Sequence, residues 1–262
     1  MTAPKAEFRC IALSQPGPTK KRNEDALLLD GKVHQGSIRL EQTIKRKAGE
    51  ALLLAVADGM AGSPVPHVGS SLLLQLLDES FRKSPAPTEN LRERLLDLQD
   101  AFVERARKMR SRGTSATLAG VVISDDKVQV FNVGDSRVYG IVDGTIRQLS
   151  RDHTELADMI DNGEIEPMTA REAPSSFLEP SSFYMADPMH TLTRIFLRTL
   201  PLSEVGQILI CSDGLTEVLD DEEIAEAAQT GITSLLSLIT TARKRNGMDD
   251  ITTVAISKLR TA

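Results

Sequence analysis

Short apolar runs of strand length follow one another along the chain, and two pairs of longer helical segments interrupt them. The strand-like runs are residues 8–13, 26–29, 51–57, 117–123, 128–133, 137–142, 145–149, 207–211 and 251–257, and the helical segments are 68–83, 91–110, 221–228 and 232–244. Because the helices come in pairs, the order is not the strict strand–helix alternation of a parallel sheet. It predicts an α+β fold with antiparallel strands covered by helix pairs. With no dividing linker, we expect a single domain over residues 1–262.

The composition excludes several classes of protein. A formal net charge of −6 over 262 residues argues against a chain whose main task is to neutralise nucleic-acid phosphates. The longest apolar run, Ala51–Ala57, is too short to cross a bilayer, and the first ten residues hold no signal-like stretch. Cys10 and Cys211 both lie in apolar runs, which excludes a disulfide scaffold and a Cys-rich zinc site. We expect a cytoplasmic protein with no nucleic-acid or membrane partner.

Two segments fit neither pattern. Residues 31–50 contain the basic run Ile44-Lys45-Arg46-Lys47, which is typical of a solvated hairpin excursion, with a basic contact site as the alternative. Residues 159–188 contain four prolines, at 167, 174, 180 and 188, which exclude a long uninterrupted helix. A loop of this length is either a functional lid or a surface insertion whose phenylalanines pack onto the body.

The sequence lacks the common phosphate-binding and nucleophile motifs. It contains no glycine-rich phosphate loop, no G-x-S-x-G and no H-E-x-x-H. Its four histidines, at 34, 67, 153 and 190, are scattered, which makes an imidazole-rich metal site improbable.

Acidic residues stand at the ends of five apolar runs. They are Asp25 (after Glu24), Asp58, Asp135, Asp213 and Asp249. Each one alone is typical of a turn, but a sheet can bring distant strand ends together. Converging carboxylates repel one another, so such a cluster requires a cation. Oxygen ligands select Mg²⁺ or Mn²⁺, and the carbonyl of Gly59 is a further candidate ligand.

These segments resemble the motif series of the metal-dependent Ser/Thr protein phosphatases, the protein phosphatase 2C (PPM) family, in its bacterial type. The resemblance runs from about residue 13 to residue 256, with the motifs in the family's order. They are Lys20-Lys21-Arg22-Asn23-Glu24-Asp25, Asp58-Gly59-Met60-Ala61-Gly62, Gly113-Thr114-Ser115-Ala116-Thr117, Val133-Gly134-Asp135-Ser136-Arg137, Leu149-Ser150-Arg151-Asp152-His153-Thr154, Leu192-Thr193-Arg194, Cys211-Ser212-Asp213-Gly214-Leu215 and Asp249-Asp250-Ile251-Thr252.

The resemblance implies a four-layer α-β-β-α sandwich with a two-metal centre at one edge. Asp58 would bridge two Mn²⁺ or Mg²⁺ ions, with the Gly59 carbonyl on one ion and Asp213 and Asp249 on the other. Glu24 and Asp25 would act through metal-bound waters. Asp135, with Asp213, matches the position of a third ion in bacterial members, and residues 159–188 match the family's flap.

The implied activity is hydrolysis of phosphoserine and phosphothreonine by water or hydroxide activated at the metal centre, with no covalent phosphoenzyme. The implied partners are phosphorylated protein substrates and a cognate Ser/Thr kinase pathway. Two other interpretations remain open. One is a catalytically weak or inactive relative that acts as a phosphoprotein-binding adaptor, and the other is a hydrolase of small phosphate esters.

Several positions depart from the family pattern. Lys20 stands where a phosphate-holding arginine is usual, so it keeps the charge and loses the bidentate fork, and Arg22 is the alternative phosphate contact. Met60 replaces the histidine of many eukaryotic members. Residues 63–67 depart from the usual small-residue loop, and Asp250 replaces the usual asparagine. His153 favours a structural, hydrogen-bonded role.

Overall fold

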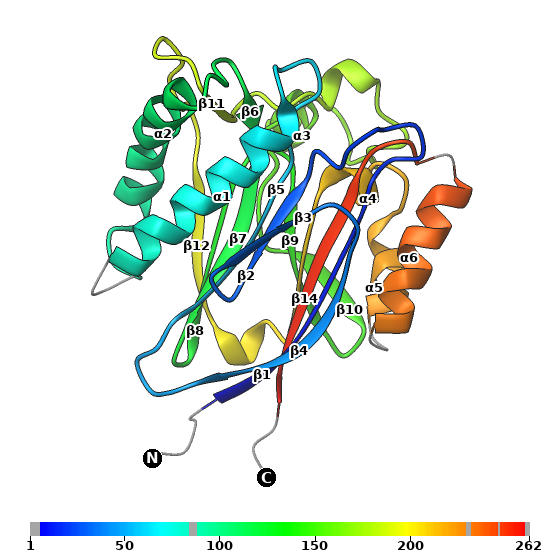
Figure 1. The fold of residues 1–262 in the computed structure, drawn as a ribbon. Helices are drawn as coiled ribbons and strands as arrows, with labels where there is room; N and C mark the ends of the chain where they lie inside the picture. Colours follow the sequence, from blue (N-terminus) through cyan, green and yellow to red (C-terminus); the bar gives the residue numbers. More distant parts are fainter. Residues whose placement is uncertain (1–5, 84–87, 229–231, 246, 260–262) are drawn as a thin grey trace.

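The computed structural model describes residues 6–83, 88–228, 232–245 and 247–259. Residues 1–5, where the sequence predicts no targeting segment, lie outside this description. Two six-stranded antiparallel sheets pack face to face, and helices cover both outer faces (Figure 1). The predicted α+β sandwich of four layers is therefore confirmed.

The first sheet holds both ends of the described chain. Its strand order is β10-β9-β13-β14-β1-β4. The bounds are β1 Ala6–Gln15, β4 Ile38–Arg46, β9 Arg137–Val142, β10 Thr145–Gln148, β13 Gln207–Cys211 and β14 Ile251–Leu259. On its outer face lie α4 (Asp213–Thr216), α5 (Asp221–Ala228) and α6 (Ile232–Lys244).

The second sheet has the order β12-β8-β7-β5-β2-β3. Its strands are β2 Ala26–Leu29, β3 Lys32–Gln35, β5 Leu52–Ala57, β7 Leu118–Ser124, β8 Lys127–Val133 and β12 Phe196–Pro201. Helices α1 (Pro66–Lys83) and α2 (Leu91–Lys108) cover its outer face. The short strands β6 (Ser115–Ala116) and β11 (Tyr184–Met185) pair beside them, and α3 is Glu155–Asp161.

Strand β5 is apolar at every position because it is buried on both of its faces. All six of its residues are buried. Leu53 and Ala55 pack under α1 and α2, whereas Leu52, Leu54 and Val56 pack against the other sheet. Because side chains alternate across a strand, a central strand of a four-layer fold needs apolar residues on both faces.

The interpretation of residues 31–50 as a solvated hairpin excursion is wrong. β3 pairs with β2 in one sheet, and β4 crosses over to pair with β1 along the edge of the other sheet. Lys45 and Arg46 form ion pairs with Glu7 and Asp30, which accounts for two charges of the basic run. Polar residues on an exposed edge strand hid its strand pattern.

Two further findings bear on the sequence expectations. Within the described residues, no helix combines the length and the apolar character that a membrane crossing requires. Cys10 and Cys211 are buried free thiols, and burial raises the pKa of each to about 12.

Because β5 packs against apolar layers on both faces, truncating a side chain on either face should lower the free energy of unfolding by a comparable amount. Leu53→Ala and Leu54→Ala should each lower the free energy of unfolding by about 2–5 kcal/mol, because each leaves a cavity in a packed layer. Leu96→Ala on α2, where the side chain is 45% exposed, is the matched control and should change it by less than about 0.5 kcal/mol. Urea unfolding measures all three. A small loss for either β5 variant would contradict the four-layer core.

Candidate metal centre

The ends of β2, β5, β13 and β14 meet at one end of the sandwich. Ala26 pairs with Ala57, so Asp25 and Asp58, one residue beyond each, leave their sheet at the same end. In the other sheet, Ser212 follows β13 and donates its N–H to the carbonyl of Thr252 at 3.0 Å. The sheets are joined here because the Ser212 hydroxyl donates to the Asp25 carboxylate at 2.7 Å.

The Asp58 and Asp213 carboxyls lie close enough that each influences the pKa of the other. Burial, reinforced by the charges of Asp25 and Asp213, raises the pKa of Asp58 well above its usual range. Burial also raises the pKa of Asp213. Two ionised carboxylates at this separation repel each other strongly.

Three buried carboxylate oxygens lack any hydrogen-bond partner within the described residues. They are Oδ1 of Asp25, Asp135 and Asp213. Burial raises the pKa of Asp25 from its ordinary 3.8 to about 7, and burial with the nearby Asp213 charge raises that of Asp135 well above its usual range. Unpaired buried oxygens of this kind fit a hard divalent cation.

Lys20 stands among the other predicted ligands. Its ammonium donates to Glu24 at 2.8 Å, to Asp249, and to Asp250 at 3.2 Å. Although burial opposes it, hydrogen bonding to Asp249 and Glu24 raises the pKa of Lys20. In the part of the chain that the structure describes, no three potential ligand side chains already stand in a metal-binding arrangement. The side chains of Glu24 and Asp249 instead contact the Lys20 ammonium.

Gly59 allows the backbone to approach this cluster. Its N–H donates to the carbonyl of Glu24 at 3.1 Å. A Cβ at this position would collide with the carbonyl oxygens of Pro66 and Glu24. No larger residue fits here without a backbone shift.

Arg22, the alternative phosphate contact, lies in the loop between β1 and β2, and its side chain reaches the start of α1. Its Nη1 is 3.0 Å from His67 Nε2. The preceding loop contains Val65 with φ 47°, a strained conformation for a β-branched residue. Residues 63–67 therefore differ from a simple small-residue turn, as the sequence departure indicates.

Sequence reasoning missed Glu217. Partial desolvation of its carboxyl group, together with the Asp213 and Asp249 charges, raises its pKa to about 7, although the residue as a whole is exposed. Its spacing of four residues from Asp213 was the available signal, because residues i and i+4 share one face of a helical turn.

His153 accepts the Gly134 N–H at Nδ1 (3.1 Å), and burial lowers its pKa to about 4, which agrees with the structural role favoured from sequence.

The expected flap is partly fixed and partly open. Tyr184 is fully buried and donates its hydroxyl to the Leu95 carbonyl at 2.9 Å. Residues 175 and 176, in contrast, are exposed. Leu178 lines a cavity of about 30 Å³ together with Asp135, Asp213 and Glu217. The segment thus reaches the carboxylate cluster.

The sequence of this chain is similar to those of known proteins. Residues 30–250 match the family model described as protein phosphatase 2C. The serine/threonine phosphatase stp of Listeria monocytogenes is 27% identical over 216 residues, which cover 79% of this chain and 84% of that protein. The serine/threonine protein phosphatase PstP of Mycobacterium tuberculosis is 29% identical over 231 residues, covering 84% of this chain and 43% of PstP.

Solved structures share the fold. The serine/threonine phosphatase Stp1 of Staphylococcus aureus superposes with a TM-score of 0.77 at 22% identity, covering 99% of this chain and 96% of that one. The catalytic domain of PstP in complex with two manganese ions gives a TM-score of 0.67 at 23% identity, covering 98% of this chain and all of that one.

The raised pKa of Asp25 predicts a pH-dependent stability in chelator. The folded state keeps a proton that the unfolded state loses near pH 4, so this group's contribution to the unfolding free energy falls as pH rises from about 4 to 7 and then levels off. Relative to Asp25→Asn, the wild type should lose stability across this window, and Mn²⁺ should reduce the loss. Urea unfolding at successive pH values measures the difference. A constant difference at every pH would contradict the prediction.

Proposed function

This chain belongs to the protein phosphatase 2C family, and we propose that it hydrolyses phosphoserine and phosphothreonine in proteins with water or hydroxide activated at a two-metal centre. The observation that carries the proposal is the set of unpartnered buried carboxylate oxygens at one end of the sandwich. A protein gains no stability from such a cluster, so a bound cation is the physical reason to keep it.

The roles proposed for the ligands follow the resemblance to the family's motifs. Asp58 would bridge two Mn²⁺ or Mg²⁺ ions, with the Gly59 carbonyl, Asp213 and Asp249 as further ligands. Glu24 and Asp25 would bind through waters, and Asp135 with Asp213 and Glu217 would hold a third ion. Such ions lower the pKa of water toward neutrality and offset the phosphoryl charge.

The remaining chemistry rests on the chain's own groups. Both cysteine thiols are buried with pKa values near 12, which disfavours a thiolate nucleophile and supports direct attack by water. The Lys20 ammonium lies beside Glu24 and Asp249, and we assign it the contact to the phosphoryl oxygens, one of which would take the place of a carboxylate acceptor. Met60 offers no proton, so the leaving alkoxide would take its proton from water.

Phosphoproteins are the proposed substrates, supplied by a Ser/Thr kinase pathway. A groove of about 560 Å³ runs beside the site, between the base of the flap and α5. Leu156 and Met168 contribute apolar surface to it, and Asp161 and Asp221 contribute charge. A groove of this size accommodates part of a polypeptide chain. The unpaired thiols agree with a reducing, cytoplasmic location.

One experiment separates the enzyme from the adaptor. Hydrolysis of an aryl phosphate and of a phosphothreonine peptide is measured with Mn²⁺, with chelator, and in Asp58→Asn. We expect activity only with the divalent ion, and a loss in the variant of about 100-fold or more. Asp143→Asn, in the exposed turn between β9 and β10, is the matched control. Activity that persists in chelator would contradict the metal mechanism. Phosphopeptide binding without hydrolysis under any divalent ion would favour the adaptor.

The flap should select among protein substrates. Replacing the exposed Ser175–Phe177 turn with Gly-Ser-Gly leaves Leu178 and the buried Tyr184 in place. We expect kcat/KM to change between phosphoproteins by several-fold while the aryl phosphate is hydrolysed as before. Equal loss on all substrates would show that the turn supports the site and does not select substrates.

A further inference from the structure

The loop that carries Lys20, Glu24 and Asp25 has no regular secondary structure. It joins β1, which ends at Gln15, to β2, which begins at Ala26. Three of its residues are proposed site groups, so their positions depend on whatever fixes the loop to the body of the protein.

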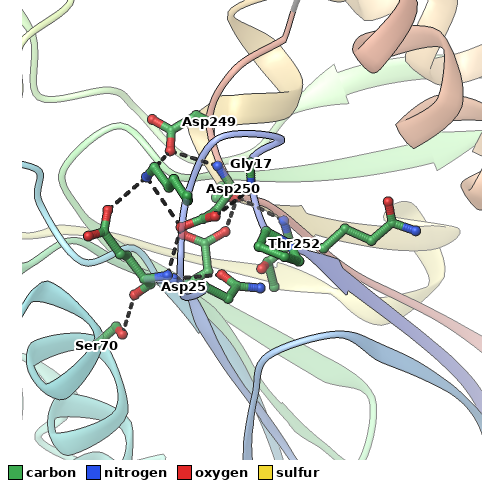
Figure 2. A network of polar contacts seen from close by, with 12 residues as sticks. Gly17, Asp25, Ser70, Asp249, Asp250 and Thr252 are labelled. Carbon is green, nitrogen blue, oxygen red and sulfur yellow. Dashed lines mark hydrogen bonds and ion pairs between the residues drawn. The ribbon is translucent and has the colours of Figure 1, made fainter.

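Asp250 fixes both ends of this loop. Its Oδ1 accepts the Gly17 N–H at 2.7 Å, and its Oδ2 accepts the Glu24 N–H at 2.6 Å (Figure 2). The side chain is fully buried. An asparagine could accept only one of these bonds, because its NH₂ group would face the other N–H donor. The loop therefore requires a carboxylate at position 250.

The same carboxylate completes the surroundings of Lys20. A lysine ammonium has three N–H donors, and here they face three acceptors, on Glu24, Asp249 and Asp250. A lysine is ordinarily a flexible point charge, whereas an arginine carries a rigid planar fork. Three acceptors fix the direction of the ammonium, which compensates for the missing rigidity.

The far side of Glu24 is held as well. Its carbonyl accepts from the Gly59 N–H and from the Ser70 hydroxyl. The backbone N–H and carbonyl of Glu24 thus link Asp250, which precedes β14 in one sheet, to the Asp58–Gly59 segment that follows β5 in the other sheet. A change at Asp250 is transmitted directly to the Lys20–Glu24 side of the metal centre.

We propose that Asp250 is a positioning residue, whose buried carboxylate clamps the loop at Gly17 and Glu24 and adapts the site to a lysine at position 20. The effect on catalysis rests on the proposed phosphatase function, whereas the clamp itself does not.

Amide hydrogen exchange tests the clamp without substrate or metal. In Asp250→Asn, the Gly17 and Glu24 amides should exchange about tenfold faster or more, while the amide of Val254 inside β14 stays protected. Asp143→Asn is the matched control and should leave both loop amides unchanged. Unchanged exchange at Gly17 and Glu24 in Asp250→Asn would overturn the clamp.

A double-mutant cycle tests the adaptation to lysine. Lys20→Arg and Asp250→Asn should each lower kcat/KM for an aryl phosphate with Mn²⁺ about tenfold, and each should weaken competitive inhibition by inorganic phosphate. The double variant should lose less kcat/KM than the product of the two single losses, because an arginine fork spans the remaining two carboxylates without a third acceptor.

The outcomes are distinguishable. If Asp250 is purely structural, Asp250→Asn will lower the melting temperature equally with lysine or arginine at position 20, and the two losses of kcat/KM will be independent. That result would overturn the adaptation to lysine. If Asp250→Asn does not fold, Lys20→Arg alone tests the adaptation to lysine. Phosphate binding that is tighter in Lys20→Arg than in the wild type would contradict a site adapted to lysine. If the wild type hydrolyses nothing with any divalent ion, the proposed function fails, while hydrogen exchange still decides the clamp.

Discussion

Repulsion among buried carboxylates is the constraint on which the rest of this structure depends. Asp25, Asp58 and Asp135 are at least nine-tenths buried, and Asp213 beside them is partly buried. Asp25, Asp135 and Asp213 each keep a buried oxygen without a partner in the described part of the chain. This arrangement opposes folding unless protons or cations neutralise it. The sandwich tolerates it because two sheets and their covering helices bury a large apolar surface around three hydrophobic clusters.

Neutral groups set the geometry around these charges. Ser212 donates its hydroxyl to Asp25 and accepts the Thr252 N–H at 2.9 Å, so one serine joins strand β14 to the loop before β2. The Asn23 amide donates to the Ser14 hydroxyl at 2.7 Å, which in turn bonds Thr252. Buried networks of this kind hold side chains in one arrangement when their members are satisfied. The carboxylates therefore meet on a rigid frame and not on mobile loops alone.

The flap, residues 159–188, is likewise anchored in some places and exposed in others. Arg194 anchors its base by donating to both oxygens of Asp158 (2.7 and 2.8 Å) and to the Ser181 hydroxyl at 2.6 Å. The turn at residues 175–177 lies between the anchored parts and remains exposed in part. A segment fixed at both sides and open in the middle can vary its contacts with substrate while the metal centre keeps its shape.

The sequence alone determined the regular elements with strong periodicity and the acidic residues at strand ends. The bounds predicted for β9, β13, α5 and α6 agree with the structure because their apolar patterns face a packed core. The edge strands β3, β4 and β12 were missed because half-exposed strands carry mixed residues. The three-carboxylate setting of Lys20 and the closeness of Glu217 to Asp249 were decided only by the tertiary structure. Their partners lie up to 230 positions away in sequence, and only the pairing of sheets brings them together.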